Sequence, residues 1–161
     1  MRMLVVDDEA EIADMLAEYF TLEGFEVTCA NSGSEALVAA PRGFDIILLD
    51  VNMPGMDGFE VCRRIREHLS CPIIFLTARI EDVDQLDGFA AGADDYVLKP
   101  FSLPVLGRRV AAHMAREGRS RQDDLAVRFF GELTIDYGKR SVEVRRAGEP
   151  AVPVELSLIH I

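Results

Sequence analysis

Apolar residues along the first two thirds of the chain follow two alternating spacings. Short runs rich in apolar residues predict buried strands, and between them apolar residues recur every three or four positions, as on one face of an amphipathic helix. The expected strands are Met3–Val6, Glu26–Ala30, Phe44–Leu49, Pro72–Thr77 and Tyr96–Leu98, and the expected helices are Ile12–Phe20, Glu35–Ala40, Phe59–Glu67, Val83–Ala91 and Leu103–Arg116. This alternation predicts an α/β fold, a doubly wound five-stranded parallel sheet covered by helices on both faces.

The pattern changes after residue 117. Residues 118–127 are polar and of mixed charge, which is typical of a linker. Four short strands are expected to follow, at Arg128–Phe130, Leu133–Ile135, Ser141–Arg145 and Val152–Val154, and they predict a small antiparallel sheet. The sequence therefore predicts one domain over residues 1–117 and a β region over residues 128–157 that is too short for a core of its own.

Charge supports the same division. The chain has 17 Lys and Arg against 28 Asp and Glu, a net charge of -11. The whole excess lies in residues 1–117, because residues 118–161 carry seven side chains of each sign. Such an acidic chain is poorly suited to coat nucleic acid with its whole surface.

Neither a membrane span nor a secretory signal is visible. No apolar run approaches the length of about 18 residues that a span needs, and no charged lead and long apolar stretch open the chain. The three cysteines are odd in number and outside CxxC spacing, so we expect reduced thiols rather than a disulfide framework or a metal site. They are Cys29, Cys62 and Cys71. These features predict a cytoplasmic protein.

Polar residues stand at the carboxyl ends of the expected strands, where parallel α/β sheets bind their ligands. Asp7 and Asp8 follow the first strand, Asp50 follows the third, Thr77 ends the fourth and Lys99 follows the fifth. Three clustered carboxylates need a neutralising cation, and oxygen ligands favour Mg²⁺. A carboxylate beside Mg²⁺ and an ammonium is suited to accept a phosphoryl group, with Asp50 as the in-line nucleophile. The simpler interpretation of a single strand-end aspartate is a helix cap, which for Asp8 would be that of the first helix.

Residues 1–117 resemble the receiver domain of bacterial two-component response regulators. The resemblance covers the whole segment and rests on a set of motifs. They are Asp7-Asp8, Leu48-Leu49-Asp50, Met53-Pro54-Gly55-Met56-Asp57-Gly58, Thr77-Ala78, Gly92-Ala93-Asp94-Asp95-Tyr96 and Lys99-Pro100-Phe101. The resemblance implies a flavodoxin-like fold and phosphorylation of Asp50 by a sensor histidine kinase.

The resemblance also implies a role for the neighbours of Asp50. Asp7, Asp8 and Asp50 would hold Mg²⁺ together with the main-chain carbonyl of Asn52. Lys99 would bind the phosphoryl group, and its peptide bond to the following proline would be cis.

A switch pair is implied as well. Thr77 would bind the phosphoryl group and turn toward it, and Tyr96 would then turn inward to fill the space. Asn52 and Arg79 occupy the positions where the family tunes the lifetime of the phosphoryl group.

The residues of the last two motifs resemble those of the OmpR/PhoB subfamily of transcription factors. In that subfamily the fourth helix, the fifth strand and the fifth helix form a symmetric dimer face held by charge pairs. Arg109 matches the basic position on the last helix, with Asp94 or Asp95 as its partner, and the alternative is a solvated helix arginine. Asp87 and Val105 stand where the subfamily carries a second charge pair, so that pair is absent here.

Residues 128–157 resemble the N-terminal β-sheet of that subfamily's winged-helix DNA-binding domain. The recognition helix that would follow is missing, and residues 158–161 are interpreted as vector-derived. DNA recognition needs a helix in the major groove and basic contacts to phosphate. We therefore expect no specific binding of promoter DNA by this chain, although its full-length parent would bind it.

Two other functions compete with that of a phosphorylation-controlled transcription regulator. A Mg²⁺-dependent phosphatase that works through an aspartyl phosphate needs an acid two residues after the nucleophile, and Asn52 cannot serve as one. A stand-alone phosphorelay receiver is disfavoured by the subfamily motifs and by the β region. We expect no enzyme beyond self-catalysed phosphorylation and dephosphorylation of Asp50.

Overall fold

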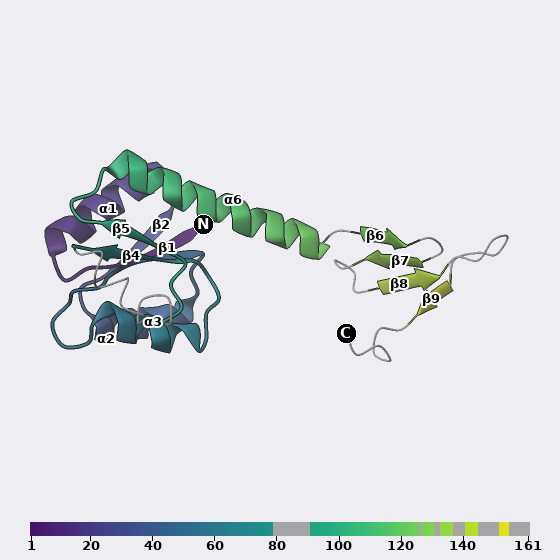
Figure 1. Ribbon diagram of the computed structural model, residues 1–161, viewed down its shortest axis with the longest axis horizontal. Coiled ribbons are helices and arrows are strands. Elements are labelled where there is room, and N and C mark those ends of the chain that lie inside the picture. Colours follow the sequence, from purple (N-terminus) through teal and green to yellow (C-terminus); the bar gives the residue numbers. More distant parts are fainter. Residues whose placement is uncertain (79–90, 126, 131–132, 137–140, 145–151, 155–161) are drawn as a thin grey trace. The chain divides into compact units, whose positions relative to one another are not determined.

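The computed structural model describes residues 1–78 and 91–125 and four short strands beyond them, with side chains as far as residue 119 (Figure 1). The chain divides into two compact units, Met1–Met114 and Ala115–Ile161. The helix expected at Val83–Ala91 lies outside the described residues except for its last residue, as do Arg79 and Asp87.

The first unit is built on a five-stranded parallel sheet, as the apolar pattern predicts. Its strands lie in the order β2-β1-β3-β4-β5. They are β1 (Arg2–Val6), β2 (Glu26–Ala30), β3 (Ile46–Asp50), β4 (Ile73–Thr77) and β5 (Asp95–Leu98). Every residue of β3 and β4 is buried, because helices cover both faces of the sheet, and this explains their unbroken apolar runs.

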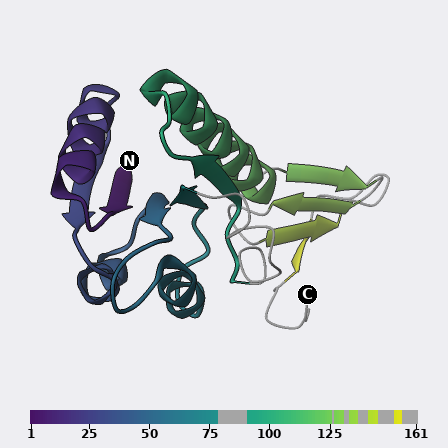
Figure 2. The same cartoon turned by 60° about the vertical axis from the view of Figure 1, so that its left-hand side comes forward.

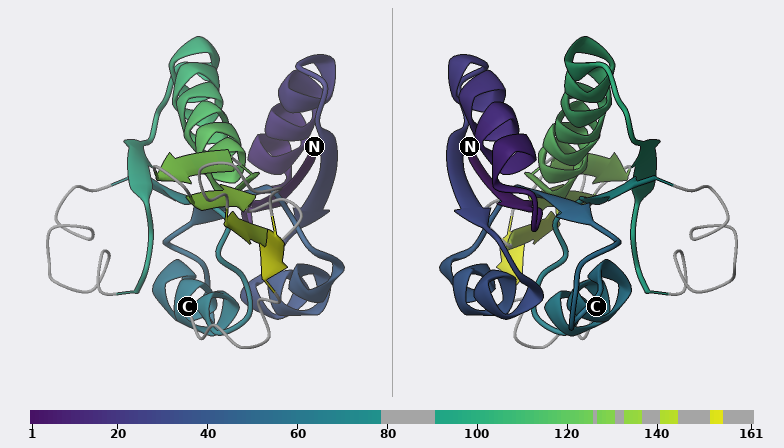
Figure 3. Two further views of the ribbon diagram at one scale, coloured as in Figure 1. Left: turned by 90° about the vertical axis from the view of Figure 1, so that its right-hand side faces the viewer. Right: turned by 90° about the vertical axis from the view of Figure 1, so that its left-hand side faces the viewer.

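The helices that the structure describes lie on the sheet in two pairs. They are α1 (Ala10–Leu22), α2 (Gly33–Ala39), α3 (Gly58–Arg66) and α6 (Leu103–Leu125), with a 3-10 turn, η1 (Ala40–Arg42), after α2. Residues of α1 and the first half of α6 pack on one face of the sheet, and residues of α2 and α3 pack on the other. Figures 2 and 3 show these two layers around the sheet. The expected doubly wound α/β fold is therefore confirmed.

The ends of the early helices follow local sequence signals. Gly24 lies just beyond α1 with φ 97°, and the Ser32 hydroxyl accepts a hydrogen bond from the Glu35 amide at the start of α2. Pro41 lies just after α2, inside η1, where its missing N–H costs little. Met15 is 41% exposed, although its spacing placed it on the buried stripe of α1.

The last helix continues beyond the point where we expected it to end. Its expected end was Arg116, but α6 runs to Leu125 and takes up most of the segment interpreted as a linker. No proline interrupts this stretch, and its arginines, glutamine and leucine are good helix formers, so the polar composition was not a stop signal. The domain boundaries themselves stay predictions.

The second unit contains the expected antiparallel sheet. Its four strands pair in the order β6-β7-β8-β9. They are β6 (Val127–Phe130), β7 (Leu133–Asp136), β8 (Ser141–Val144) and β9 (Val152–Val154). Its assignment to a winged-helix domain stays a prediction, and residues 155–161 lie outside the described residues. Among the described helices, none has the length and apolar character needed to cross a membrane.

Candidate functional site

The parallel sheet brings the predicted polar residues to one edge. Asp7 follows β1, Asp50 ends β3 and Thr77 ends β4, while Lys99 comes directly after β5. Because all five strands are parallel, these carboxyl ends meet at the same edge. The peptide bond between Lys99 and Pro100 is cis, as the resemblance implied.

Lys99 joins two of the carboxylates. Its ammonium nitrogen lies 2.8 Å from Oδ2 of Asp7 and 3.3 Å from Oδ1 of Asp50. Asp7 is fully buried and Asp50 is 3% exposed, so both carboxylates have lost nearly all contact with water. Buried charges are tolerated when they are paired, and Lys99 provides that pairing.

The Asp50 carboxyl has a raised pKa. Burial raises its pKa first, the nearby Asp7 charge adds to this, and Lys99 counteracts both, which leaves a pKa of about 7. Burial works to lower the pKa of Lys99, but its contacts with Asp7 and Asp50 outweigh this and raise that pKa above its ordinary value. Asp50 is therefore a carboxylate whose charge depends on how well its neighbours neutralise it.

Three carboxylates form a candidate cation site. Ligand oxygens of Asp7, Asp8 and Asp50 all lie within 4.8 Å of one another, and Asp8 is exposed to solvent. Asp8 does not cap α1, because the residue at that cap is Glu9, so the simpler interpretation of Asp8 is wrong. A donor set of three carboxylates open to water on one side fits Mg²⁺, which binds few protein oxygens and keeps several waters.

The loop after β3 is tied closely to the phosphoacceptor candidate. The Asn52 amide donates to Oδ1 of Asp50 at 3.3 Å, and the Gly58 amide donates to the Val51 carbonyl at 2.9 Å. A Cβ at Gly58 would lie 2.3 Å from the Asp50 carbonyl oxygen and 2.8 Å from Cα of Val51. Only glycine allows α3 to begin this close to the end of β3. The proposed role of the Asn52 carbonyl stays a prediction.

Thr77 and Tyr96 lie on neighbouring strands. Thr77 is fully buried at the end of β4, and Tyr96 pairs in register with Phe75, two residues before Thr77. Residues two apart on a strand share a face, so Thr77 and Tyr96 face the same side of the sheet. Tyr96 packs partly buried against the core that contains Phe75. This placement is compatible with a switch pair, whose role stays a prediction.

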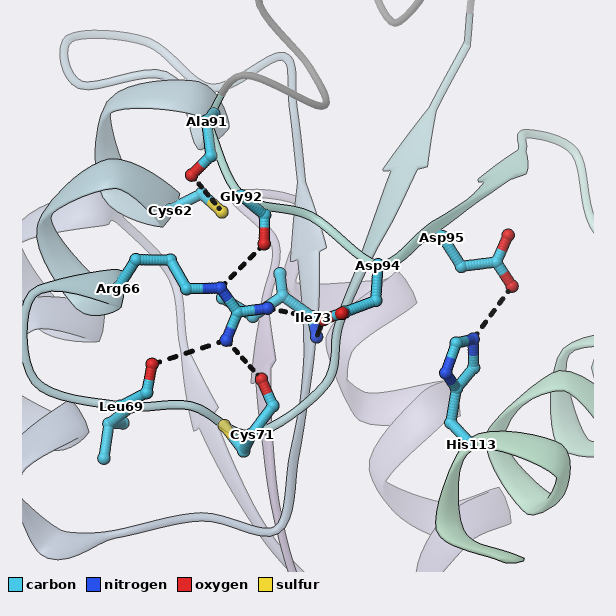
Figure 4. A network of polar contacts seen from close by, with 10 residues as sticks. All are labelled: Cys62, Arg66, Leu69, Cys71, Ile73, Ala91, Gly92, Asp94, Asp95 and His113. Carbon is cyan, nitrogen blue, oxygen red and sulfur yellow. Dashed lines mark hydrogen bonds and ion pairs between the residues drawn. The ribbon is translucent and has the colours of Figure 1, made fainter. Parts of the chain in front are cut away.

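The two adjacent aspartates before Tyr96 have different partners (Figure 4). Asp95 binds Arg109, with Nη1 at 2.9 Å from Oδ1, and its Oδ2 lies 3.2 Å from Nε2 of His113. Asp94 accepts instead from the Arg66 guanidinium and, at 2.8 Å, from the Ile73 amide. Within the chain Arg109 therefore pairs with Asp95 and not with Asp94, and the place of these residues on a dimer face stays a prediction.

Arg66 was not anticipated from the sequence. It is the last residue of α3, and its guanidinium donates to the carbonyl oxygens of Gly92 (2.7 Å), Leu69 (3.4 Å) and Cys71 as well as to Asp94. Cys62, one helical turn earlier, donates to the Ala91 carbonyl at 3.3 Å. Figure 4 shows these contacts converging on the turn before β5. Arg66 and Asp94 together fix the start of the strand that leads to Lys99.

Replacing Asp94 with alanine is expected to lower the free energy of unfolding by about 1–3 kcal/mol, because it removes the acceptor of the Arg66 Nη2 group and of the Ile73 amide. Chemical denaturation would measure this. An Asp94→Ala protein as stable as the wild type would contradict the anchoring role.

The family model for the response regulator receiver domain matches residues 3–111. The chain belongs to the response regulator receiver family. This identity agrees with the five-stranded fold and with the acidic site at the strand ends, and it assigns the protein to two-component signal transduction. The expectation that rested on the sequence motifs is confirmed.

Several relatives of the chain are transcriptional regulatory proteins. The chain is 38% identical to the transcriptional regulatory protein ResD of Bacillus subtilis (99% of this chain, 69% of that protein) and 40% identical to AfsQ1 of Streptomyces coelicolor (98% and 69%). It spans only about half of another relative, YvrH of Bacillus subtilis (52%).

Solved structures agree. A two-component response regulator from Clostridium difficile matches with a TM-score of 0.69 and 28% identity, over 73% of this chain and 98% of that one. The response regulator DrrB of Thermotoga maritima, described as an OmpR/PhoB homologue, matches with a TM-score of 0.65 and 32% identity, over 92% of this chain and 66% of that one. The receiver protein therefore has OmpR/PhoB-type relatives.

Proposed function

We propose that Asp50 accepts a phosphoryl group from a sensor histidine kinase, and that this modification controls association and transcription by the protein. The observation that carries the proposal is the meeting of Asp7, Asp8, Asp50 and Lys99 at one sheet edge, with the ammonium of Lys99 bridging Asp7 and Asp50. Because the chain spans half to about two thirds of its relatives, the activity of a longer parent belongs to this proposal too.

The chemistry follows from the residues at the edge. A carboxylate oxygen of Asp50 attacks phosphorus in line, the bond from phosphorus to the imidazole nitrogen of the kinase histidine breaks, and that nitrogen keeps the electron pair. Lys99, already 3.3 Å from Asp50, binds a phosphoryl oxygen. Asp7, Asp8, Asp50 and the Asn52 carbonyl would hold Mg²⁺, which when bound supplies positive charge to the carboxylates and the phosphoryl oxygens.

The effect of phosphorylation is proposed to reach β4 and β5, which carry Thr77 and Tyr96. Thr77 would turn its hydroxyl toward the phosphoryl group, and Tyr96 would move inward on the same face of the sheet. β5 also carries Asp95 beside Arg109 of α6. An acid and a base side by side make a self-complementary surface, which a symmetric dimer requires.

Apolar side chains accompany this charge pair. Leu98 is 38% and Val105 46% exposed, and both line a groove of about 360 Å³ that Arg109 also borders. We propose that a second copy of the chain occupies this groove. Arg109 of each copy would then pair with the Asp95 carboxylate of the other. Val105 stands where the OmpR/PhoB subfamily carries one member of a second charge pair. That pair is absent here, and the apolar contact made by Val105 takes its place.

A full-length parent with a complete winged-helix domain would bind promoter DNA as such a dimer, and we place the reaction in the cytoplasm. The chain is not proposed as an enzyme beyond its own phosphorylation and dephosphorylation. The four-stranded sheet after α6 favours a regulator over a stand-alone phosphorelay receiver. Asn52, which cannot act as an acid, disfavours a phosphatase.

The proposal is tested by phosphorylation with acetyl phosphate or phosphoramidate in a titration of Mg²⁺, followed on a phosphate-affinity gel. We expect a shifted band only with Mg²⁺. Asp8→Asn should need at least tenfold more Mg²⁺, because it removes one ligand of the cation site while leaving Asp50 in place. Asp14→Asn, an exposed aspartate on α1, is the matched control and should behave as the wild type. Equal phosphorylation in EDTA and in Mg²⁺ would contradict the metal assignment.

A further inference from the structure

His113 is a buried polar side chain that the proposed phosphorylation does not use. It is 7% exposed and follows Leu106 and Val110 on the apolar stripe of α6, which packs against the sheet. A hydrophobic side chain would suit this position, yet the imidazole Nε2 lies 3.2 Å from Oδ2 of Asp95 (Figure 4). Buried polar side chains normally form hydrogen bonds, so the contact with Asp95 explains why a histidine occupies this position.

The direction of this hydrogen bond follows from the charge of Asp95. Burial works to raise the pKa of the Asp95 carboxyl, but hydrogen bonds from the Tyr96 amide, His113 and Arg109 outweigh it and hold that pKa below its ordinary value. The carboxylate is therefore ionised at neutral pH and only accepts hydrogen bonds. Nε2 of His113 must then carry the proton and donate it.

Asp95 has two fixed partners and one exposed partner. The Tyr96 amide donates to Oδ1 at 2.8 Å and His113 donates to Oδ2, and the side chains of Asp95 and His113 are only 19% and 9% exposed. Arg109 lies across both oxygens, at 2.9 and 3.1 Å, but its side chain is 48% exposed. Arg109 is thus the partner that can be exchanged without breaking a buried contact.

We propose that His113 is a positioning residue for dimerisation, which fixes the Asp95 carboxylate so that it can take the Arg109 guanidinium of a second copy of the chain. The inference rests on the proposed phosphorylation-dependent dimer. A carboxylate held in one orientation before association loses less conformational freedom when the partner's guanidinium binds it. Without His113, that ordering cost falls on the association step.

The test compares wild type, His113→Leu and His113→Gln after phosphorylation with phosphoramidate and Mg²⁺. Phosphate-affinity gels measure the phosphorylated fraction, sedimentation velocity measures the dimer dissociation constant, and thermal unfolding checks the fold. We expect equal phosphorylation in all three proteins. The dissociation constant of His113→Leu should rise about tenfold, which corresponds to about 1.4 kcal/mol. His113→Gln should stay within about threefold of wild type, because its amide can donate to the same oxygen.

His68→Leu, an exposed histidine after α3, is the matched control and should dimerise as the wild type does. Equal dimer strength in wild type and His113→Leu would overturn the inference alone. Equal weakening in the Leu and Gln variants would also overturn it, because it would indicate packing rather than a hydrogen bond. A wild type that is phosphorylated but stays monomeric would instead overturn the proposed dimer, and the inference with it.

Discussion

Replacing Asp50 with asparagine is expected to abolish phosphorylation and, at the same time, to stabilise the fold. The amide lacks the nucleophilic carboxylate, so no phosphoryl group can be accepted at this position. The same change removes a buried negative charge beside Asp7 while Lys99 keeps its pairing with Asp7. A functional site that is costly to the fold commonly shows this opposition between activity and stability.

The gain in stability should depend on pH. The Asp50 carboxyl has a pKa raised from 3.8 to about 7, so between these values the folded chain keeps a proton that the unfolded chain has lost. The unfolded state then binds fewer protons, and the free energy of unfolding of the wild type falls as pH rises through this range. The free energy of unfolding of Asp50→Asn should not show this decrease. The stability advantage of Asp50→Asn should grow from about pH 4 to pH 7 and then level off, at on the order of 4 kcal/mol.

Denaturation in EDTA at several pH values would measure this difference, with Asp14→Asn as a control that should show no such trend. Adding Mg²⁺ should reduce the gap, because a cation that binds only the folded wild type stabilises it by mass action. A difference that is constant from pH 4 to pH 8 would contradict the raised pKa of Asp50. A phosphorylated Asp50→Asn protein would contradict its assignment as phosphoacceptor.

The strands and the acidic edge were predictable because their signals are local and repeated. A strand buried on both faces is apolar along its length, and β3 and β4 are apolar up to the single polar residue that ends each of them. Once five such strands alternate with helices, parallel topology places their carboxyl ends together. Asp7, Asp50 and Lys99 then converge without any knowledge of side-chain conformations.

The partners of Asp94 and Asp95 were not predictable in the same way. Neighbouring residues in extended chain point to opposite sides, so two identical side chains meet different surroundings. Asp94 meets Arg66, whose other acceptors are main-chain carbonyls that carry no sequence signal. His113 did offer a signal, a lone histidine on the apolar stripe of a helix and one turn after Arg109, but only the fold shows that Asp95 faces it.

Replacing Gly58 with alanine is expected to cost about 3 kcal/mol or more in the free energy of unfolding and to slow phosphorylation of Asp50. The added Cβ would lie 2.3 Å from the Asp50 carbonyl oxygen and 3.0 Å from its carbonyl carbon, where no flexible side chain can give way. Relief requires the start of α3 to move from the end of β3, which breaks the 2.9 Å hydrogen bond from the Gly58 amide to Val51. The Asp50 carboxylate would shift with its backbone.

Gly118→Ala is the matched control, since apart from the backbone of α6 itself nothing lies within 4 Å of the added Cβ. It should raise stability by about 0.5–1 kcal/mol, because alanine loses less conformational freedom than glycine on forming a helix. Denaturation curves and the rate of phosphorylation by phosphoramidate would be measured for both variants. If Gly58→Ala matched the wild type in both, the close approach of α3 to β3 would not constrain the site. A loss of stability with an unchanged rate would show that α3 supports the fold without positioning Asp50.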